Sequence, residues 1–263
     1  MVFSSTELLA QLNDLIWPLF RIAGLVTAMP ILGPRLLPPR IKVVFVVALT
    51  LAIAPHIESP AAQVEMFSLA GGMVALQQVL IGLTMGFALQ LVFAVFVLGG
   101  QVIALTMGLG FASLNDPSTG IVVPTVSQFY SIFVTLLFFA MNGHLILIEV
   151  LANSFVALPV SSSWAVYDGI WSLLRWGTYI FSGAVLMALP AIASMLLVNI
   201  GFGVMTRAAP QLNIFAVGFP IIMTLGFVII LVSLPSVIPL FESILESSFD
   251  LMRTIVGGSA NAS

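Results

Sequence analysis

The chain has 263 residues, of which 60% are hydrophobic and only 6% are charged. Its formal net charge is −3, and seven lysines and arginines are too few to form a basic surface for nucleic acid. The sequence has no cysteine, which excludes disulfides, thiolate metal sites and cysteine nucleophiles. The low charge and the mean hydropathy of +1.21 exclude an ordinary water-soluble domain, whose surface needs charged side chains to stay solvated.

Long uncharged runs divide the sequence. No Asp, Glu, Lys or Arg occurs between Glu65 and Asp116, and further uncharged runs follow Asp116, Arg175 and Arg207. Each run is longer than the roughly 20 apolar residues that a helix needs to cross a bilayer core. The sequence therefore predicts an all-α integral membrane protein.

Charges and turn residues separate about six long apolar helices. We expect these helices at residues 8–31, 41–57, 67–107, 127–155, 170–205 and 214–234. The third would be about 60 Å long if it were one helix, which is twice the thickness of the hydrocarbon core. It must therefore either break at Gly99-Gly100 or project well outside the bilayer.

Charged residues occur inside the apolar segments. Glu7, Asp14 and Arg21 are spaced by seven and share one face of the first helix, and Glu149 lies in the fourth. Since the start of the chain carries acids in place of a basic n-region, we expect no cleavable signal peptide there. A charge at a helix centre costs about 2.5–3.5 kcal/mol, so Asp14 and Arg21 should face protein or water. A structural pair and a role in an ion path both remain open for them.

Small and polar residues form a stripe on the third helix. Gln78, Gly82, Gly86 and Gln90 are spaced by four and therefore share a face. Small residues let helix backbones approach closely, and amides can hydrogen-bond a neighbouring helix. This stripe is predicted to pack against another helix or another subunit.

The C-terminal segment has an acidic face. Glu242, Glu246 and Asp250 repeat every four residues, and Phe241, Ile244, Leu245, Phe249 and Met252 occupy the remaining surface. This pattern predicts an amphipathic helix. A helix on anionic lipid would carry Lys and Arg instead, so a protein partner or a water-filled vestibule suits this face better.

No enzyme motif is present in the sequence. His56 and His144 form no His-Glu-Xaa-Xaa-His pair, and Glu149 lies about 140° around a helix from His144. A Gly-Xaa-Ser-Xaa-Gly elbow and a phosphate-binding glycine loop are both absent. We therefore expect neither catalysis nor a cofactor or metal.

The connection at residues 107–120 is unusual. Its glycines and its Asn-Asp-Pro sequence predict non-helical backbone, yet it carries a single charge and several apolar side chains. Irregular backbone at membrane depth is tolerated where protein buries it or where it lines a cavity. The segment is therefore either a connection packed against the helices or a re-entrant gate or plug. Its core comprises Met107, Gly108, Leu109, Gly110, Phe111, Ala112, Ser113, Leu114, Asn115, Asp116 and Pro117.

Several motifs resemble the FliR family, the flagellar type III export-gate subunits related to the SctT proteins of virulence injectisomes. The resemblance covers essentially the whole chain, in order. The motifs are Gly33-Pro34-Arg35, Pro38-Pro39-Arg40-Ile41-Lys42, the run from Gln101 to Leu109, Asp116-Pro117, Asn142-Gly143-His144, Arg207-Ala208-Ala209-Pro210-Gln211-Leu212-Asn213-Ile214-Phe215 and Gly218-Phe219-Pro220.

The resemblance implies an architecture and partners. Residues 1–183 would be similar in fold to FliP, and residues 184–263 would resemble a FliQ hairpin. One copy of the chain would join FliP and FliQ in a pore in the bacterial inner membrane, at the flagellar basal body. FlhB and FlhA would lie nearby, and unfolded flagellar proteins would pass through the pore.

The resemblance also implies roles for particular residues. Residues 107–120 would plug the closed pore, with Leu109, Phe111 and Leu114 as its apolar obstruction. Gly108 and Gly110 would let the backbone turn and swing aside. Residues of the later loop would face the cytoplasmic entrance or neighbouring subunits, namely Arg207, Pro210, Gln211 and Asn213.

Two other classes of function remain as alternatives. An ion-coupled secondary transporter would use Pro190 and Pro220 to break helices around a midplane site, with Asp14 or Glu149 coupling ions. It would predict an inverted internal repeat, which the sequence does not contain. A structural membrane scaffold without a passage is the second alternative.

Overall fold

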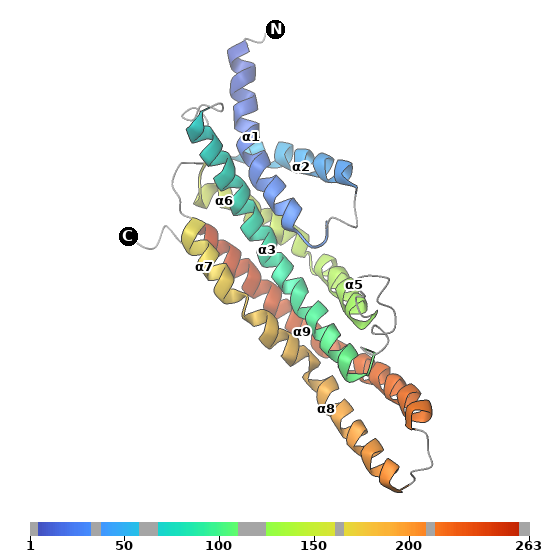
Figure 1. Ribbon diagram of the computed structural model, residues 1–263. Helices are drawn as coiled ribbons and strands as arrows, with labels where there is room; N and C mark the ends of the chain where they lie inside the picture. The colour runs from blue at the N-terminus through green and yellow to red at the C-terminus, as the bar shows by residue number, and fades with distance from the viewer. Residues whose placement is uncertain are drawn as a thin grey trace. The chain divides into compact units, whose positions relative to one another are not determined.

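The computed structural model describes residues 5–32, 38–57, 68–109, 125–160, 166–208 and 214–257 (Figure 1). These residues form α-helices and a single 3₁₀ turn, η1, and no strand occurs among them. The elements are α1 (Ser5–Ala28), α2 (Pro39–Ile53), η1 (Ala54–His56), α3 (Leu69–Thr106), α5 (Thr125–Ala140), α6 (Gly143–Ala157), α7 (Val166–Trp176), α8 (Tyr179–Ala208) and α9 (Ile214–Gly257). The predicted all-α membrane fold is confirmed.

The count of about six long apolar helices is not confirmed. Three stretches of the described chain are long and apolar enough to cross a membrane, at Leu69–Thr106, Gly169–Ala208 and Gly218–Gly257. The pair α5 and α6 would make a fourth if it is treated as one broken span. The expected helix at 41–57 is shorter than predicted, because α2 ends at Ile53 and gives way to η1.

The third helix does not break at its two adjacent glycines. α3 has 38 residues and passes through Gly99 and Gly100 without interruption. A Cβ at Gly100 would lie 2.9 Å from the Cα of Ser127 in α5, so this glycine permits a close approach between two helices. At 1.5 Å per residue α3 is about 57 Å long, which exceeds the roughly 30 Å hydrocarbon core.

The fourth predicted segment is two helices. α5 and α6 meet at a bend of 67°. Asn142 at this break is the only non-glycine residue of the described chain with a positive φ, which is 56°. Asn tolerates this left-handed conformation better than most residues because its short polar side chain can hydrogen-bond locally. The helix therefore ends where Asn-Gly occurs, although the flanking residues are apolar.

The chain divides into two compact units, and α3 and α9 contribute to both. The first comprises residues 1–91, 139–177 and 245–263, and the second comprises 92–138 and 178–244. In the first unit Trp17 of α1 packs with Val74 of α3 and Val160 after α6. In the second unit aromatic rings meet edge to face, with Phe93–Phe138 and Phe96–Phe241 centroids 6.0 and 5.5 Å apart. Such pairs add about 0.5–1.5 kcal/mol to the burial of the rings.

Burial differs among the apolar helices. In the most apolar stretch of α3, 67% of the residues are buried, against 17% in the most apolar stretch of α9. Leu231 and Val232 of α9 and Leu197 of α8 are about as exposed as surface residues of a soluble protein, at 67%, 76% and 71%. Large apolar side chains at these exposures require lipid or other subunits around them. The chain is a membrane protein.

Candidate functional site

The first residues of the predicted plug form the capped end of α3. The Gly108 amide donates to the Leu105 carbonyl at 3.1 Å, and the Leu109 amide donates to the Ala104 carbonyl at 3.0 Å. This pair of bonds is a Schellman motif, in which the last carbonyls of a helix receive donors from the residues just past it. The motif needs a left-handed residue, and Gly108 has φ of 77°.

Met107 is seated against α9 within the second unit. Its side chain is fully buried, at 0% exposure. A Cβ at Gly226 would lie 2.5 Å from its Cε and 2.7 Å from its Cγ, so the thioether occupies the space that a larger residue at 226 would fill. Phe219 of α9 faces the Cα of Gly108, with ring carbons 3.8–3.9 Å from a Cβ built there. The start of the loop is thus held by packing and by backbone hydrogen bonds.

The remainder of the predicted plug lies outside the described residues. This part comprises Gly110, Phe111, Ala112, Ser113, Leu114, Asn115, Asp116 and Pro117. Of the two glycines expected to let the backbone turn, the structure describes Gly108 alone. Its role there is to cap α3, and the plug itself stays a prediction.

The small-residue stripe of α3 lies against α1 along three of its four positions. The Gln78 Oε1 accepts a hydrogen bond from Arg21 Nε at 2.8 Å. A Cβ at Gly82 would collide with the carbonyl oxygen of Arg21, and one at Gly86 would lie 2.6 Å from the Leu25 carbonyl oxygen. Gln90 is exposed. The stripe therefore mediates a close contact inside the chain, and a role at a subunit interface stays a prediction.

The intramembrane charges have different surroundings. Arg21 is fully buried, and all four of its hydrogen bonds go to neutral oxygen atoms. Glu149 is exposed on α6. Asp14 lies in α1, but its side chain is outside the described residues. An Asp14–Arg21 pair and an ion path through either residue both stay predictions.

The loop between α8 and α9 is described only at its edges. Arg207 lies in the last turn of α8 and is exposed. A cation at a helix C-terminus interacts favourably with the helix dipole, which accounts for the position of Arg207 at the end of α8. Pro210, Gln211 and Asn213 lie outside the described residues.

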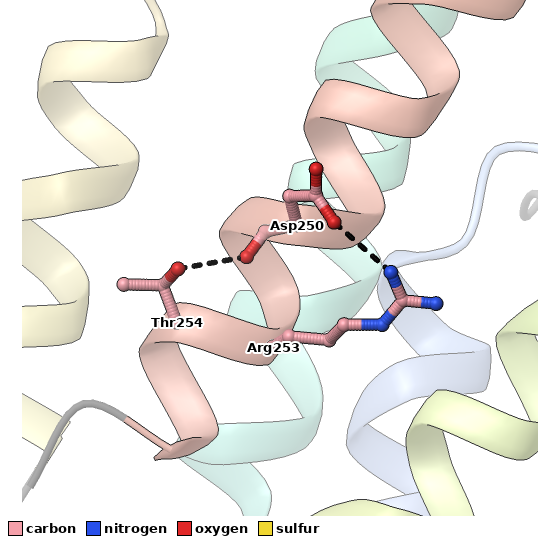
Figure 2. Close-up of polar contacts among 3 residues, drawn as sticks. All are labelled: Asp250, Arg253 and Thr254. Carbon is pink, nitrogen blue, oxygen red and sulfur yellow. Dashed lines mark hydrogen bonds and ion pairs between the residues drawn. The ribbon is translucent and has the colours of Figure 1, made fainter.

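The acidic face of the C-terminal segment belongs to α9, which runs without a break to Gly257. Glu242, Glu246 and Asp250 are exposed on it. Asp250 accepts a bond from Arg253 at 2.9 Å through its side chain and one from Thr254 Oγ1 at 2.8 Å through its backbone carbonyl (Figure 2). Because the Asp250–Arg253 pair is exposed, it contributes at most about 1 kcal/mol.

His144 lies beside an aromatic ring of α5. His144 stacks obliquely near Phe139, with ring centroids 5.4 Å apart. No group of three or more His, Asp or Glu side chains that could hold a metal ion occurs within the described ranges. His56 lies in η1, and its side chain is outside the described residues.

Sequence reasoning missed three glycines that matter for packing. Gly24 of α1 faces the Val79 carbonyl oxygen of α3, Gly226 of α9 accommodates Met107, and Gly183 of α8 faces Val95 of α3. Gly24 is three residues after Arg21, so a search for small residues on the face that carries the buried charge could have found it. Nothing in the spacing of Gly183 or Gly226 would have identified their partners.

The comparisons with known proteins agree with the motifs. Residues 12–248 match the model of the family described as bacterial export proteins, family 1. The chain is 37% identical to flagellar biosynthetic protein FliR of Pectobacterium carotovorum subsp. carotovorum over 256 residues, which is 97% of each chain. It is 36% identical to that of Escherichia coli (strain K12) over 96% of each chain. It is 32% identical to that of Aquifex aeolicus (strain VF5), over 82% of this chain and 83% of the relative. Because the match spans nearly its whole length, this chain belongs to the FliR family of bacterial export proteins.

Proposed function

We propose that this chain is the FliR subunit of the flagellar type III export gate. In this role one copy joins FliP and FliQ in the inner membrane at the flagellar basal body, with FlhB and FlhA adjacent. The assembly passes unfolded flagellar proteins, and the chain itself catalyses no reaction. The observation that carries the proposal is the similarity to proteins named flagellar biosynthetic protein FliR over 96–97% of the chain.

The exposed apolar surface supports a role inside a larger assembly. α8 and α9 together expose many large apolar side chains, and α3 is about 57 Å long. A bilayer core covers only about 30 Å of such a helix. The remaining apolar length needs protein around it, and neighbouring subunits of a pore assembly would supply that protein.

The predicted plug is supported by the way its first residues are held. Met107 is buried against Gly226, and Gly108 closes the Schellman motif. Any displacement of the following segment would therefore begin after Leu109, while the end of α3 stays in place. An apolar segment in this position would block ions until an exported chain displaces it, because a hydrophobic constriction excludes water.

The assembly is tested by co-expressing the chain with the FliP- and FliQ-like proteins of the same organism. Native mass spectrometry of the detergent-extracted complex then gives its stoichiometry. We expect one copy of this chain among several copies of the other two. A stable monomer or homo-oligomer that binds neither partner would refute the export-gate proposal and favour the small-molecule transporter.

The plug is tested by deleting residues 110–116 in the assembled complex and measuring ion conductance. We expect increased leakage relative to the intact complex, because the apolar obstruction is removed. Deletion of residues 259–263 provides a control of similar length, for which conductance should not change. Unchanged conductance in a fully assembled 110–116 deletion would contradict the plug while leaving the export role intact.

A further inference from the structure

Arg21 is a fully buried cation whose recorded partners are all neutral. Its Nε donates to Gln78 Oε1 of α3 at 2.8 Å, and its Nη1 donates to the Ser154 carbonyl of α6 at 2.7 Å and to Ser154 Oγ at 3.0 Å. Nη2 donates to the Leu158 carbonyl at 2.9 Å. The guanidinium also lies over the Phe155 ring, 4.1 Å from its centroid. Four hydrogen bonds and a cation–π contact therefore surround it.

Three of these four bonds converge on the end of α6. Leu158 is the C-cap residue of that helix, and its amide already donates to the Ser154 carbonyl. The last carbonyls of a helix lack donors and carry the negative end of the helix dipole. α6 has no basic residue in its own last turn. The charge that would normally complement this end is thus missing from α6, and Arg21 of α1 brings one there.

We propose that Arg21 is the C-terminal cap of α6, supplied by a different helix, and that the docking of α1 depends on it. A buried guanidinium is normally held by a carboxylate. Here the C-terminal end of α6 replaces the carboxylate, because its carbonyl oxygens and its dipole both favour a positive charge. The planar fork suits the task, since Nη1 and Nη2 point in different directions and reach two carbonyls four residues apart.

The sequence separation adds a consequence for folding order. Arg21 is 133 residues from Ser154 and 137 residues from Leu158. Before α6 has formed, no cap site exists for the guanidinium, and a charge at the centre of an apolar helix is costly in lipid. α1 should therefore reach its final position only after α6 is complete, although it is made first.

The competing explanation is that the bond to Gln78 holds α1 and that α6 is incidental. The two explanations differ in a double variant. Replacing both partners of a hydrogen bond with apolar groups of similar shape is nearly neutral. Arg21→Met combined with Gln78→Leu would therefore repair the contact between α1 and α3. It would leave the Leu158 carbonyl without the donor that Arg21 supplies, and the Ser154 carbonyl with the Leu158 amide alone.

The experiment uses the absence of native cysteine. Val26→Cys on α1 and Val134→Cys on α5 place single buried thiols in the full-length chain, at positions that are 2% and 0% exposed. The rate of labelling by N-ethylmaleimide in detergent micelles reports how often each site opens. Each reporter is combined with Arg21→Met, Arg21→Lys and the double variant. Arg253→Met, which removes an exposed arginine of the same unit, is the matched control.

We expect Arg21→Met to raise labelling at Val26→Cys about tenfold or more, because several buried acceptors lose their donors. The double variant should raise labelling at Val26→Cys by a similar factor. Arg21→Lys should raise that labelling, but less than Arg21→Met does, and Arg253→Met should leave it unchanged. Labelling at Val134→Cys should not rise. Wild-type labelling in the double variant would overturn the cap, and so would an equal rise at both reporters. If the Met variants do not accumulate, Arg21→Lys alone decides. Labelling of Val26→Cys at the wild-type rate in that variant would overturn the requirement for a guanidinium that reaches both carbonyls.

Discussion

Adding one methyl group to Gly82 should separate α1 from α3. A Cβ there would lie 2.8 Å from the Leu25 amide nitrogen and closer still to the Arg21 carbonyl oxygen, whereas ordinary contacts begin at 3.4 Å. Both atoms belong to the backbone, so no side-chain rotation relieves the collision. α1 must move away by at least about half an ångström, which forfeits a quarter or more of the contact energy in this interface.

A glycine with open surroundings on the same helix provides the control. Nothing lies within 4 Å of a Cβ built at Gly72. Both substitutions to alanine gain about 0.4–1 kcal/mol by restricting the unfolded chain. The difference between the two variants therefore isolates the packing cost, which is about 1–3 kcal/mol for an overpacked core. For a cost of about 2 kcal/mol, the Tm of Gly82→Ala should lie about 4–8 °C below that of Gly72→Ala.

The assay is thermal unfolding of the detergent-solubilised chain at one protein and detergent concentration. Circular dichroism gives the overall transition. Tryptophan fluorescence adds a second signal, and one of the four tryptophans, Trp17 of α1, is 2% exposed and packs against Val74 of α3. Equal Tm values for Gly82→Ala and Gly72→Ala would show that the two backbones are not in contact, and the reasoning would fail.

Further substitutions test other parts of the fold. Asn142→Gly should be tolerated and Asn142→Ala should cost about 1 kcal/mol, because the residue is left-handed; denaturant unfolding measures both. Gly108→Ala should lower stability by about 1–2 kcal/mol, because Gly108 is also left-handed. The nearest atoms leave room for a methyl group, so a lower Tm would report the backbone strain alone. Trp176→Phe should lower the free energy of unfolding by about 1 kcal/mol, because it removes the hydrogen bond from Nε1 to Ser247 Oγ. Ser247→Ala removes the same bond and should lower it by a similar amount, which denaturant unfolding measures. Gly86→Leu should abolish co-purification with the FliP- and FliQ-like proteins, and a normal yield of complex would contradict the role of the stripe.

The class of fold could be predicted because it depends on composition and on uncharged length alone. Helix ends were harder to predict, because the local signals compete with the continuity of apolar residues. The sixth helix is predicted at 214–234, yet α9 continues through Pro235 and Pro239 to Gly257. In apolar surroundings no water competes for the backbone, so a helix loses more by ending there than by losing the proline hydrogen bonds.

Residues of the candidate site could be predicted from the sequence only where they follow a regular spacing within one helix. The spacing of Glu242, Glu246 and Asp250 predicted one polar face, and all three are exposed on α9. The partners of Arg21 could not be predicted, because they come from α3 and from the end of α6 and no periodicity links these segments. The pairing of Met107 with Gly226 likewise depends on contacts between distant segments.

The glycines between α1 and α3 also determine how these helices can move. Gly24 receives the backbone of α3, while Gly82 and Gly86 receive the backbone of α1. Sliding either helix by one residue would place side chains where only hydrogen atoms fit, so the two helices have a single register. They can separate, but they cannot slip or rotate against each other while they remain in contact. Any motion that keeps this contact must therefore carry α1 and the part of α3 around Gly82 and Gly86 together as one rigid pair.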